Sequence, residues 1–202
     1  MSAHKLLLDR IEFIKVSIQS SLGTFEADAN FPQLKFDWDL ARILHRSNLL
    51  YDPKSIEDPR LFYLRMGVRI EAKEDSASLP YEVDVEAAGF LEYVGDEFSG
   101  ADRFRAVRFS GYQILYGAIR EMVANITGRS RSGVLHLPAQ QFGGMAKAHA
   151  DRDEQERQEA LAKAKEAPKK RVRKAPPSEG QAPAAPPSKA TAKAKVSKAK
   201  AQ

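Results

Sequence analysis

Apolar and polar residues alternate along four stretches in the first half of the chain, and each alternation predicts a β-strand. The first stretch covers residues 6–21, with a bulge or register break predicted near Phe13 and Ile14. The other three place apolar residues on one face of a strand: Leu34, Phe36, Trp38 and Leu40; Phe62 to Ile70; and Tyr81 to Tyr93.

Polar segments rich in turn-forming residues separate these stretches. They cover residues 23–33, 52–60 and 73–80 and contain Gly, Pro, Asp, Asn or Ser. Short connections between consecutive strands favour an antiparallel meander. Gly89 is interpreted as a bulge in the last strand. Because one face of this sheet is polar, the opposite face needs a cover.

A long amphipathic helix is predicted over residues 102–127, ended by Gly128. Its apolar residues recur at steps of three and four, which is typical of a helix with one buried face. Gly111 and Gly117 weaken the first half, and a break is predicted near Ser110 and Gly111. Residues 133–138 follow as an extended link, because the proline at its end disfavours helix in the residue before it.

The last part of the chain is strongly polar. Residues 145–167 contain two large apolar side chains among Ala, Glu, Gln, Lys and Arg, which predicts an exposed helix solvated nearly all round. Repeats of Lys, Ala and Pro follow, and such a composition predicts disorder. The expected divisions are a domain over residues 1–145, an exposed charged helix over residues 146–167 and a disordered tail over residues 168–202.

These patterns together predict an α+β fold. It consists of a four-stranded antiparallel sheet covered by a long helix, a second helix after an extended link, and a disordered tail.

Charge is distributed unevenly along the chain. The 202 residues carry a formal net charge of +5. From Lys163 onward there are twelve Lys or Arg against two Glu, so the tail is at +10 and residues 1–162 are at −5. The basic character therefore belongs to the tail, and the two parts are expected to attract partners of opposite charge.

The sequence argues against an enzyme. It contains no cysteine, which excludes disulfides, cysteine-ligated zinc and thiol nucleophiles. The four histidines lack metal-ligand spacing, and the sequence contains no nucleophile elbow and no phosphate-binding glycine loop. No cofactor is expected. No stretch approaches the length of a membrane span or signal peptide core, so a soluble cytoplasmic protein is expected.

One region resembles a known family. Residues 114–129 read ILYGAIREMVANITGR, and residues 135–142 read LHLPAQQF. SecB export chaperones have a similar layout: a long helix with an Ala-Arg-Glu-like centre, a Thr-x-Arg-like exit, and a Leu-x-Leu-x-Pro-like link ending in Phe. The upstream strands look like those of SecB in order and spacing. The resemblance covers residues 8–145 and departs from the family in two features, a proline-free segment at residues 114–117 and the basic tail.

The resemblance implies an ATP-independent holdase that forms a homotetramer, a dimer of dimers. Its clients would be unfolded preproteins bound for the Sec translocase. Because the chain departs from the family pattern, a SecB-like chaperone that protects the antitoxin of a toxin–antitoxin system is the alternative. A third hypothesis comes from the tail itself: a nucleic-acid or ribosome accessory protein that contacts nucleic acid or anionic surfaces through its positive charge.

The resemblance also implies roles for individual residues, with core packing as the alternative for each apolar one. Client contacts are expected at Phe36, Trp38, Leu135, Leu137 and Phe142. An acidic face that would bind a basic partner, in the family the translocase ATPase SecA, is expected at Glu82, Asp84 and Glu86, with a solvated strand face as the alternative. Contacts between subunits are expected at Tyr112, Leu115, Ile119 and Met122.

Overall fold

The protein is described by a computed structural model that covers residues 5–20, 36–73, 79–130 and 132–166. The elements are four strands and two long helices, with 3-10 turns at Trp38–Leu40 and Pro53–Ser55. The strands are β1 (Leu6–Ser20), β2 (Ala41–Tyr51), β3 (Leu61–Ala72) and β4 (Tyr81–Tyr93), and the helices are α1 (Gly100–Thr127) and α2 (Gly143–Glu166).

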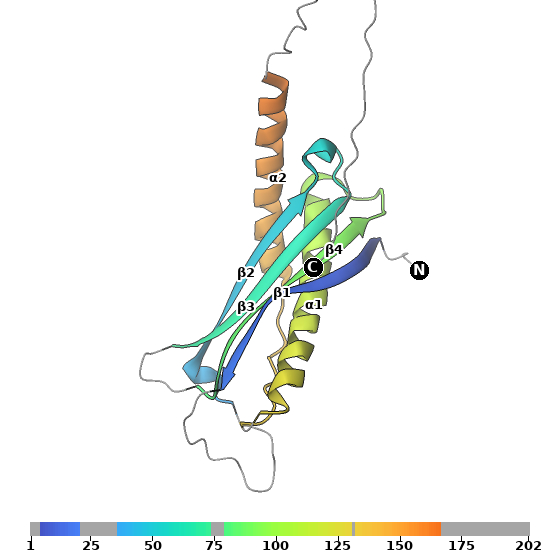
Figure 1. Ribbon diagram of the computed structural model, residues 1–202. Helices are drawn as coiled ribbons and strands as arrows, with labels where there is room; N and C mark the ends of the chain where they lie inside the picture. Colours follow the sequence, from blue (N-terminus) through green and yellow to red (C-terminus); the bar gives the residue numbers. More distant parts are fainter. Residues whose placement is uncertain (1–4, 21–35, 74–78, 131, 167–202) are drawn as a thin grey trace, which may run out of the picture. The chain divides into compact units, whose positions relative to one another are not determined.

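The strands form one antiparallel sheet in the order β1-β4-β3-β2, so β1 and β2 are its edges. Both helices lie on the same side of this sheet (Figure 1). The α+β fold predicted from the sequence, a four-stranded antiparallel sheet covered by a long helix with a second helix after a link, is therefore confirmed.

The core lies between α1 and the middle of the sheet. Alternate residues of β3 and β4 are buried, and Val107, Leu115 and Ile119 of α1 pack on them. A Cβ on Gly111 would overlap the side chains of Leu64 and Leu91, so the glycine lets α1 approach the sheet closely. The helix is continuous through this glycine, and the predicted break at Ser110–Gly111 is wrong.

The irregularities of the sheet lie in β1. Its register with β4 shifts between Phe13 and Lys15, which confirms the predicted break, and shifts again between Leu8 and Arg10. The bulge predicted at Gly89 is wrong, because this residue pairs in register with both neighbouring strands. The glycine instead leaves room for Leu115, whose Cδ2 atom would lie 3.3 Å from an added Cβ.

The second strand does not lie where the alternation of residues 34–41 predicts it. Residues 34 and 35 lie outside the described residues, Trp38–Leu40 is a 3-10 turn, and β2 begins at Ala41. The pattern of β2 is obscured because two positions facing the helices, His45 and Ser47, are polar. Ser47 occupies such a position because its hydroxyl joins a buried hydrogen-bond network.

Helix α2 packs along α1 and is not solvated all round as its composition predicts. Ala146 and Ala150 belong to the core, and the charged Asp153 and Arg157 are also buried. Small side chains bring the two helices together but bury little apolar area. Polar contacts therefore supply much of the attachment of α2.

A buried network joins α2 to α1 and β2. The guanidinium of Arg108 donates two hydrogen bonds to the carboxylate of Asp153, one of them with an Nη2–Oδ1 distance of 2.7 Å. Arg108 also donates to the hydroxyl oxygens of Tyr112 and Ser47. The Tyr112 hydroxyl in turn lies 2.8 Å from Nδ1 of His149. Burial lowers the pKa of Arg108, but Asp153 outweighs that effect and the pKa is raised overall.

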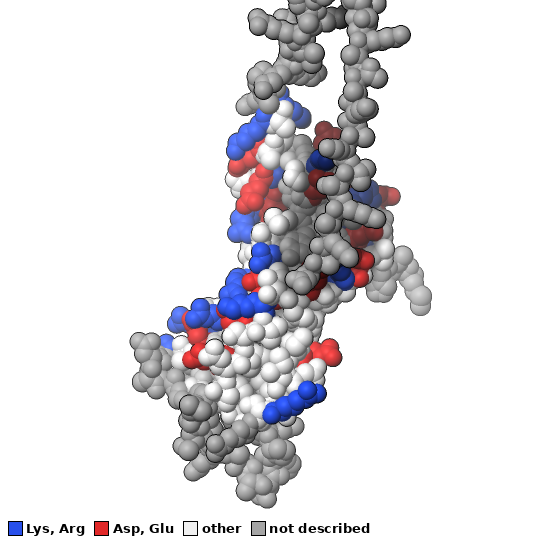
Figure 2. Space-filling view, viewed as in Figure 1, with Lys and Arg blue, Asp and Glu red and all other residues white. Residues whose placement is uncertain are grey.

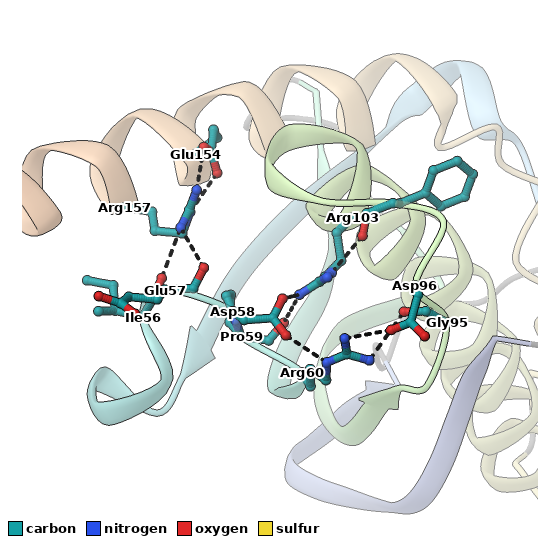
Figure 3. Close-up of polar contacts among 11 residues, drawn as sticks. Ile56, Glu57, Asp58, Pro59, Arg60, Gly95, Asp96, Arg103, Glu154 and Arg157 are labelled. Atoms are coloured by element: carbon teal, nitrogen blue, oxygen red, sulfur yellow. Dashed lines mark hydrogen bonds and ion pairs between the residues drawn. The ribbon is translucent and has the colours of Figure 1, made fainter.

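A second set of polar contacts holds α2, one turn further along at Arg157, and the start of α1 to the β2–β3 connection (Figure 3). Arg157 donates to the carbonyl oxygens of Ile56 and Glu57 at 3.0 and 3.2 Å. Arg103 of α1 donates to Asp58 and, at 3.0 Å, to the carbonyl of Pro59. This connection is thereby fixed by both helices.

The network makes a prediction for the stability of the protein. Arg108→Met leaves the buried carboxylate of Asp153 without its partner, so the free energy of unfolding should fall by about 3 kcal/mol or more. Arg105→Met on the exposed face of α1 is the control and should cost under about 0.5 kcal/mol. Urea denaturation measures both. A double variant, Arg108→Met with Asp153→Leu, should recover most of the loss, and a double variant as unstable as the single one would contradict this account.

A second prediction concerns pH. Burial, together with the positive charges of Arg108 and Arg152, lowers the pKa of His149, while Asp153 acts in the opposite direction. The unfolded chain, with a histidine pKa of about 6.5, therefore binds the proton more readily than the folded one. The free energy of unfolding should be highest above pH of about 6.5 and fall as the pH drops through the folded pKa.

Urea denaturation at a series of pH values measures this dependence. His149→Asn places an oxygen near the position of Nδ1 but does not titrate, so it should flatten the dependence. The exposed His136→Asn is the matched control. Burial also lowers the pKa of His45, so part of the dependence should remain in the His149 variant. Identical pH profiles for the wild type and His149→Asn would contradict the prediction.

Candidate client-binding surface

Two of the five residues predicted to contact clients are partly accessible. Phe36 and Trp38 are half-buried against the core, with ring centroids 4.3 Å apart. Leu135, Leu137 and Phe142 are buried core residues. These three side chains therefore pack in the core, which was the alternative to client binding. In this conformation they expose no surface that a client could contact.

The burial of the link has a clear cause, because hydrogen bonds hold it along α1. The backbone N–H of Leu135 donates to Oγ1 of Thr127 at 2.8 Å. Tyr116 donates to the carbonyl of Pro138 at 2.6 Å, and Arg120 donates to the carbonyl of Leu137 at 3.0 Å. Burial raises the pKa of the Tyr116 hydroxyl to about 12, so this donor keeps its proton at neutral pH.

The residues predicted to lie between subunits are mostly used within the chain. Tyr112, Leu115 and Ile119 are buried against the chain's own sheet, link and second helix. Met122 is half-buried. Three of the four side chains therefore form the chain's own core, and only Met122 keeps surface that a second copy could contact.

The predicted acidic face is neutralised by cations from the other strands. Asp84 pairs with Lys15 of β1 and Arg46 of β2, both at 2.5 Å. Glu86 accepts a hydrogen bond from Arg65 of β3 at 2.7 Å, and Glu82 is exposed. In Figure 2, basic and acidic side chains lie next to one another over part of this view, above a larger area without charged side chains. This part of the sheet presents paired charges rather than a continuous acidic surface.

A glycine allows this pairing. Gly67 lies opposite Arg46 in the register of β2 and β3. An added Cβ would come within 2.6 Å of the Arg46 Nε atom, so the arginine side chain lies flat across the glycine to reach Asp84. Partial burial raises the pKa of Asp84, but the hydrogen bonds from Lys15 and Arg46 outweigh it and hold the pKa below its usual range.

The strongest candidate surface is strand β1, which the sequence did not single out. Leu8, Phe13 and Val16 pair with β4 residues whose side chains are covered by α1. They nevertheless stay 40%, 36% and 43% exposed. Leu7 and Ile14 are exposed as well. The strand thus carries apolar side chains beyond the area that α1 covers.

The backbone of β1 adds to this surface. It is an edge strand of 15 residues, and an edge strand has a row of N–H and C=O groups without a partner strand. Soluble proteins usually blunt such edges or cover them. The sequence did contain a signal for this surface: β1 has apolar residues on both of its faces, more than one covered face requires.

Among the described residues, no helix is long and apolar enough to cross a membrane. The tail over residues 168–202, with its predicted contacts to nucleic acid or anionic surfaces, lies outside the described residues.

The ion pairs of the sheet make a prediction. Gly67→Ala should displace Arg46 from Asp84, and the pKa of Asp84 should rise toward its ordinary value of about 3.9. Carboxyl chemical shifts in an NMR titration measure this change. Gly117→Ala is the matched control, since an added Cβ there meets nothing within 4 Å. The cost in stability should stay under about 1 kcal/mol, because the pairs are partly exposed. An unchanged Asp84 pKa in Gly67→Ala would contradict the role given to Arg46.

Comparison with known proteins finds chains of similar fold but no match in sequence. No family model and no curated protein matches the sequence. A solved structure, the Mycobacterium tuberculosis SecB-like chaperone in complex with a ChAD peptide from the HigA1 antitoxin, is similar with a TM-score of 0.50 and 18% identity. The match covers 69% of this chain and 93% of that chain. A protein of unknown function from Streptococcus agalactiae matches with a TM-score of 0.41 and 8% identity, over 68% of this chain and all of that chain. The chain thus has a SecB-like fold, which confirms at the level of the fold the resemblance seen in the sequence.

Proposed function

We propose that the protein is an ATP-independent holdase chaperone that binds unfolded segments of other proteins. The observation that carries the proposal is the edge strand β1: over residues 6–19 its outer edge has no partner strand among the described residues, and several of its apolar side chains stay exposed. The SecB-like fold supports it, because a chaperone with that fold has been solved with a bound peptide.

The surface has the properties that a holdase requires. An unfolded segment has unsatisfied backbone groups and exposed apolar side chains. A segment added alongside β1 would satisfy the first through strand pairing. It would cover Leu8, Phe13 and Val16 and so bury apolar area on both partners. Because backbone pairing is independent of sequence, such a site can accept many clients.

Antitoxin segments are the client class that the comparison favours. The similar Mycobacterium tuberculosis chaperone was solved with a peptide from an antitoxin. A role in preprotein export would, by the resemblance to SecB, require an acidic face that binds SecA. Asp84 and Glu86 are engaged by Lys15, Arg46 and Arg65, so their charges are already compensated. We therefore place the antitoxin-protecting role first and preprotein export second.

The same strand also suits self-association. Two copies can pair their β1 edges, and a homotetramer would then follow from contacts between the resulting dimers. Self-association and client binding would compete for the same free edge of β1, because an edge paired with a second copy has no free backbone groups for a client. Pairing with a second copy would cover the part of β1 that is exposed in the isolated chain.

A direct test is suppression of aggregation by the purified full-length protein. At several-fold molar excess over an unfolded client and without ATP, it should reduce light scattering by the aggregating client. The double variant Ile14→Asp with Val16→Asp should lose this activity, because the charges disfavour apolar docking on β1. Leu44→Asp, at an exposed site on β2, is the control and should keep it.

Light scattering and circular dichroism complete the test. The wild type should have a mass above that of one chain, and the β1 double variant should shift toward a monomer while keeping its secondary structure. If the wild type protects none of several unfolded clients, antitoxins among them, the chaperone proposal is wrong. Equal protection by the β1 variant would place client binding elsewhere.

A further inference from the structure

Helix α2 is attached to the rest of the chain by a narrow face that buries little apolar area. The buried residues of this face recur at steps of four, three and four: Ala146, Ala150, Asp153 and Arg157. Two of them are small and two are charged, so polar contacts decide whether the helix stays in place. A segment with few buried apolar contacts can open locally, at a lower free energy than the whole fold.

The polar contacts of α2 meet at a cluster of four side chains from three elements. His149 of α2 places its Nδ1 atom 2.8 Å from the hydroxyl oxygen of Tyr112 on α1 and 3.2 Å from Oγ of Ser47 on β2. The two hydroxyl oxygens lie 2.8 Å apart. The guanidinium of Arg108 on α1 donates to both of them. One imidazole of α2 therefore contacts both of the elements beneath it.

The hydrogen-bonding capacity of this cluster suits a neutral imidazole. A guanidinium only donates, whereas each hydroxyl has one proton to donate and an oxygen that accepts. Because Arg108 donates to both hydroxyl oxygens, one hydroxyl proton can go to the other oxygen and the second needs a further acceptor. Of the four groups, only the unprotonated Nδ1 of His149 accepts without also donating. The cluster is satisfied when His149 has its single proton on Nε2.

A second proton on His149 reverses this balance. Nδ1 then becomes a donor, and the four groups contain four donors but only the two hydroxyl oxygens as acceptors. At least one hydroxyl proton is left without an acceptor in the cluster, and a buried donor without a partner is costly. The imidazolium and the guanidinium of Arg108 also face the same Tyr112 oxygen, so two cations lie on either side of it.

The charges around His149 act mainly in the same direction. Burial lowers its pKa, and so do Arg108 from α1 and Arg152 on α2 itself. Asp153 acts in the opposite direction, but its carboxylate accepts two hydrogen bonds from Arg108. The member of the cluster from β2, Ser47, is uncharged. The docked position of α2 therefore disfavours the protonated histidine.

We propose that α2 is a proton-released clasp: when His149 takes up a proton, α2 leaves α1 and β2 while the sheet and α1 stay folded. Its release would uncover Tyr112 and the nearby ring of Tyr51, whose centroid lies 5.7 Å from that of Phe104. Tyr51 lies close enough to α2 for the charge of Arg157 to act on it. The exposure of these rings then depends on pH. The proposal concerns the chain itself and is independent of the holdase function.

Linkage sets the size of the effect. In the released helix His149 has the ordinary histidine pKa of about 6.5, and in the docked helix it binds the proton less readily. The equilibrium between docked and released α2 therefore shifts toward release as the pH falls below about 6.5. Between pH 7.5 and 5.5 this shift is at most about tenfold, and carboxylates with ordinary pKa values of about 4 stay ionised throughout that range.

Hydrogen exchange on the full-length protein at pH 7.5 and 5.5 tests the proposal, with rates corrected for the pH dependence of exchange in an unfolded chain. Amides in the middle of α2 should be less protected than those of β4 at both pH values and should lose protection severalfold at pH 5.5. Low concentrations of urea should weaken the protection of β4 steeply and that of α2 only slightly, because a local opening exposes little surface.

Variants identify the trigger. His149→Asn retains an acceptor but does not titrate, so the protection of α2 should no longer differ between the two pH values. His136→Asn, at an exposed position of the link, is the control and should keep the full difference. His45→Asn should also keep it, because the His45 ring packs against Tyr116 and Phe142, away from the cluster. Circular dichroism should show an intact fold for all three.

Two outcomes would overturn the proposal. If urea weakens the protection of α2 as steeply as that of β4, the helix opens only when the whole chain unfolds and is not a clasp. If the protection of α2 in the wild type does not change with pH, or changes equally in His149→Asn, His149 is not the trigger. The holdase function is measured at pH 7.5, where α2 is docked, so its failure would leave the clasp untouched.

Discussion

The width of the sheet is the constraint on which the rest of the structure depends. Strands lie about 4.8 Å apart and a helix with its side chains is about 10 Å across, so one helix covers about two strands. Helix α1 lies mainly over β4 and contacts β1 and β3 on either side of it, and Gly111 brings it close to Leu64 and Leu91. The flanking strands need other cover. On the β2 side the link and α2 supply it, with Phe142 against Tyr112 and Tyr116. On the β1 side the cover is only partial: Leu6, Ile11 and Ile18 pack against the core, whereas Leu8, Phe13 and Val16 stay partly exposed.

The two sides of the sheet are completed by different kinds of interaction. On the β2 side, small and polar residues attach α2, and its position depends on the buried pair of Arg108 and Asp153. Neither member of such a pair can be removed cheaply, because its partner would be left buried and charged. On the β1 side the remaining surface is apolar and lies beside an open backbone edge. The arrangement therefore leaves one flank closed within the chain and the other suited to partners.

The sequence predicted the elements whose pattern is set by the core alone. Strands β3 and β4 and helix α1 bury regular faces, and their periodicity is visible without partners. Strand β2 was misplaced because Ser47 occupies a half-buried position as a hydrogen-bonding residue. The acidic face was also predicted without its partners: in the folded chain, Asp84 and Glu86 are neutralised by cations from three other strands. The strand order and register that bring these groups together are properties of the folded chain, so only part of each site could be predicted.

The strand order also has a kinetic consequence. Strand β1 is made first, yet its partner is β4, with β2 and β3 between them in the chain. Pairing of β1 thus requires closure of the longest loop in the sheet, and such long-range contacts form late. During synthesis, its leucines and isoleucines emerge well before β4 exists to pair with them. Among the described strands and helices, the one with the most exposed large apolar side chains is therefore also the strand that waits longest for its partner while the chain is being made.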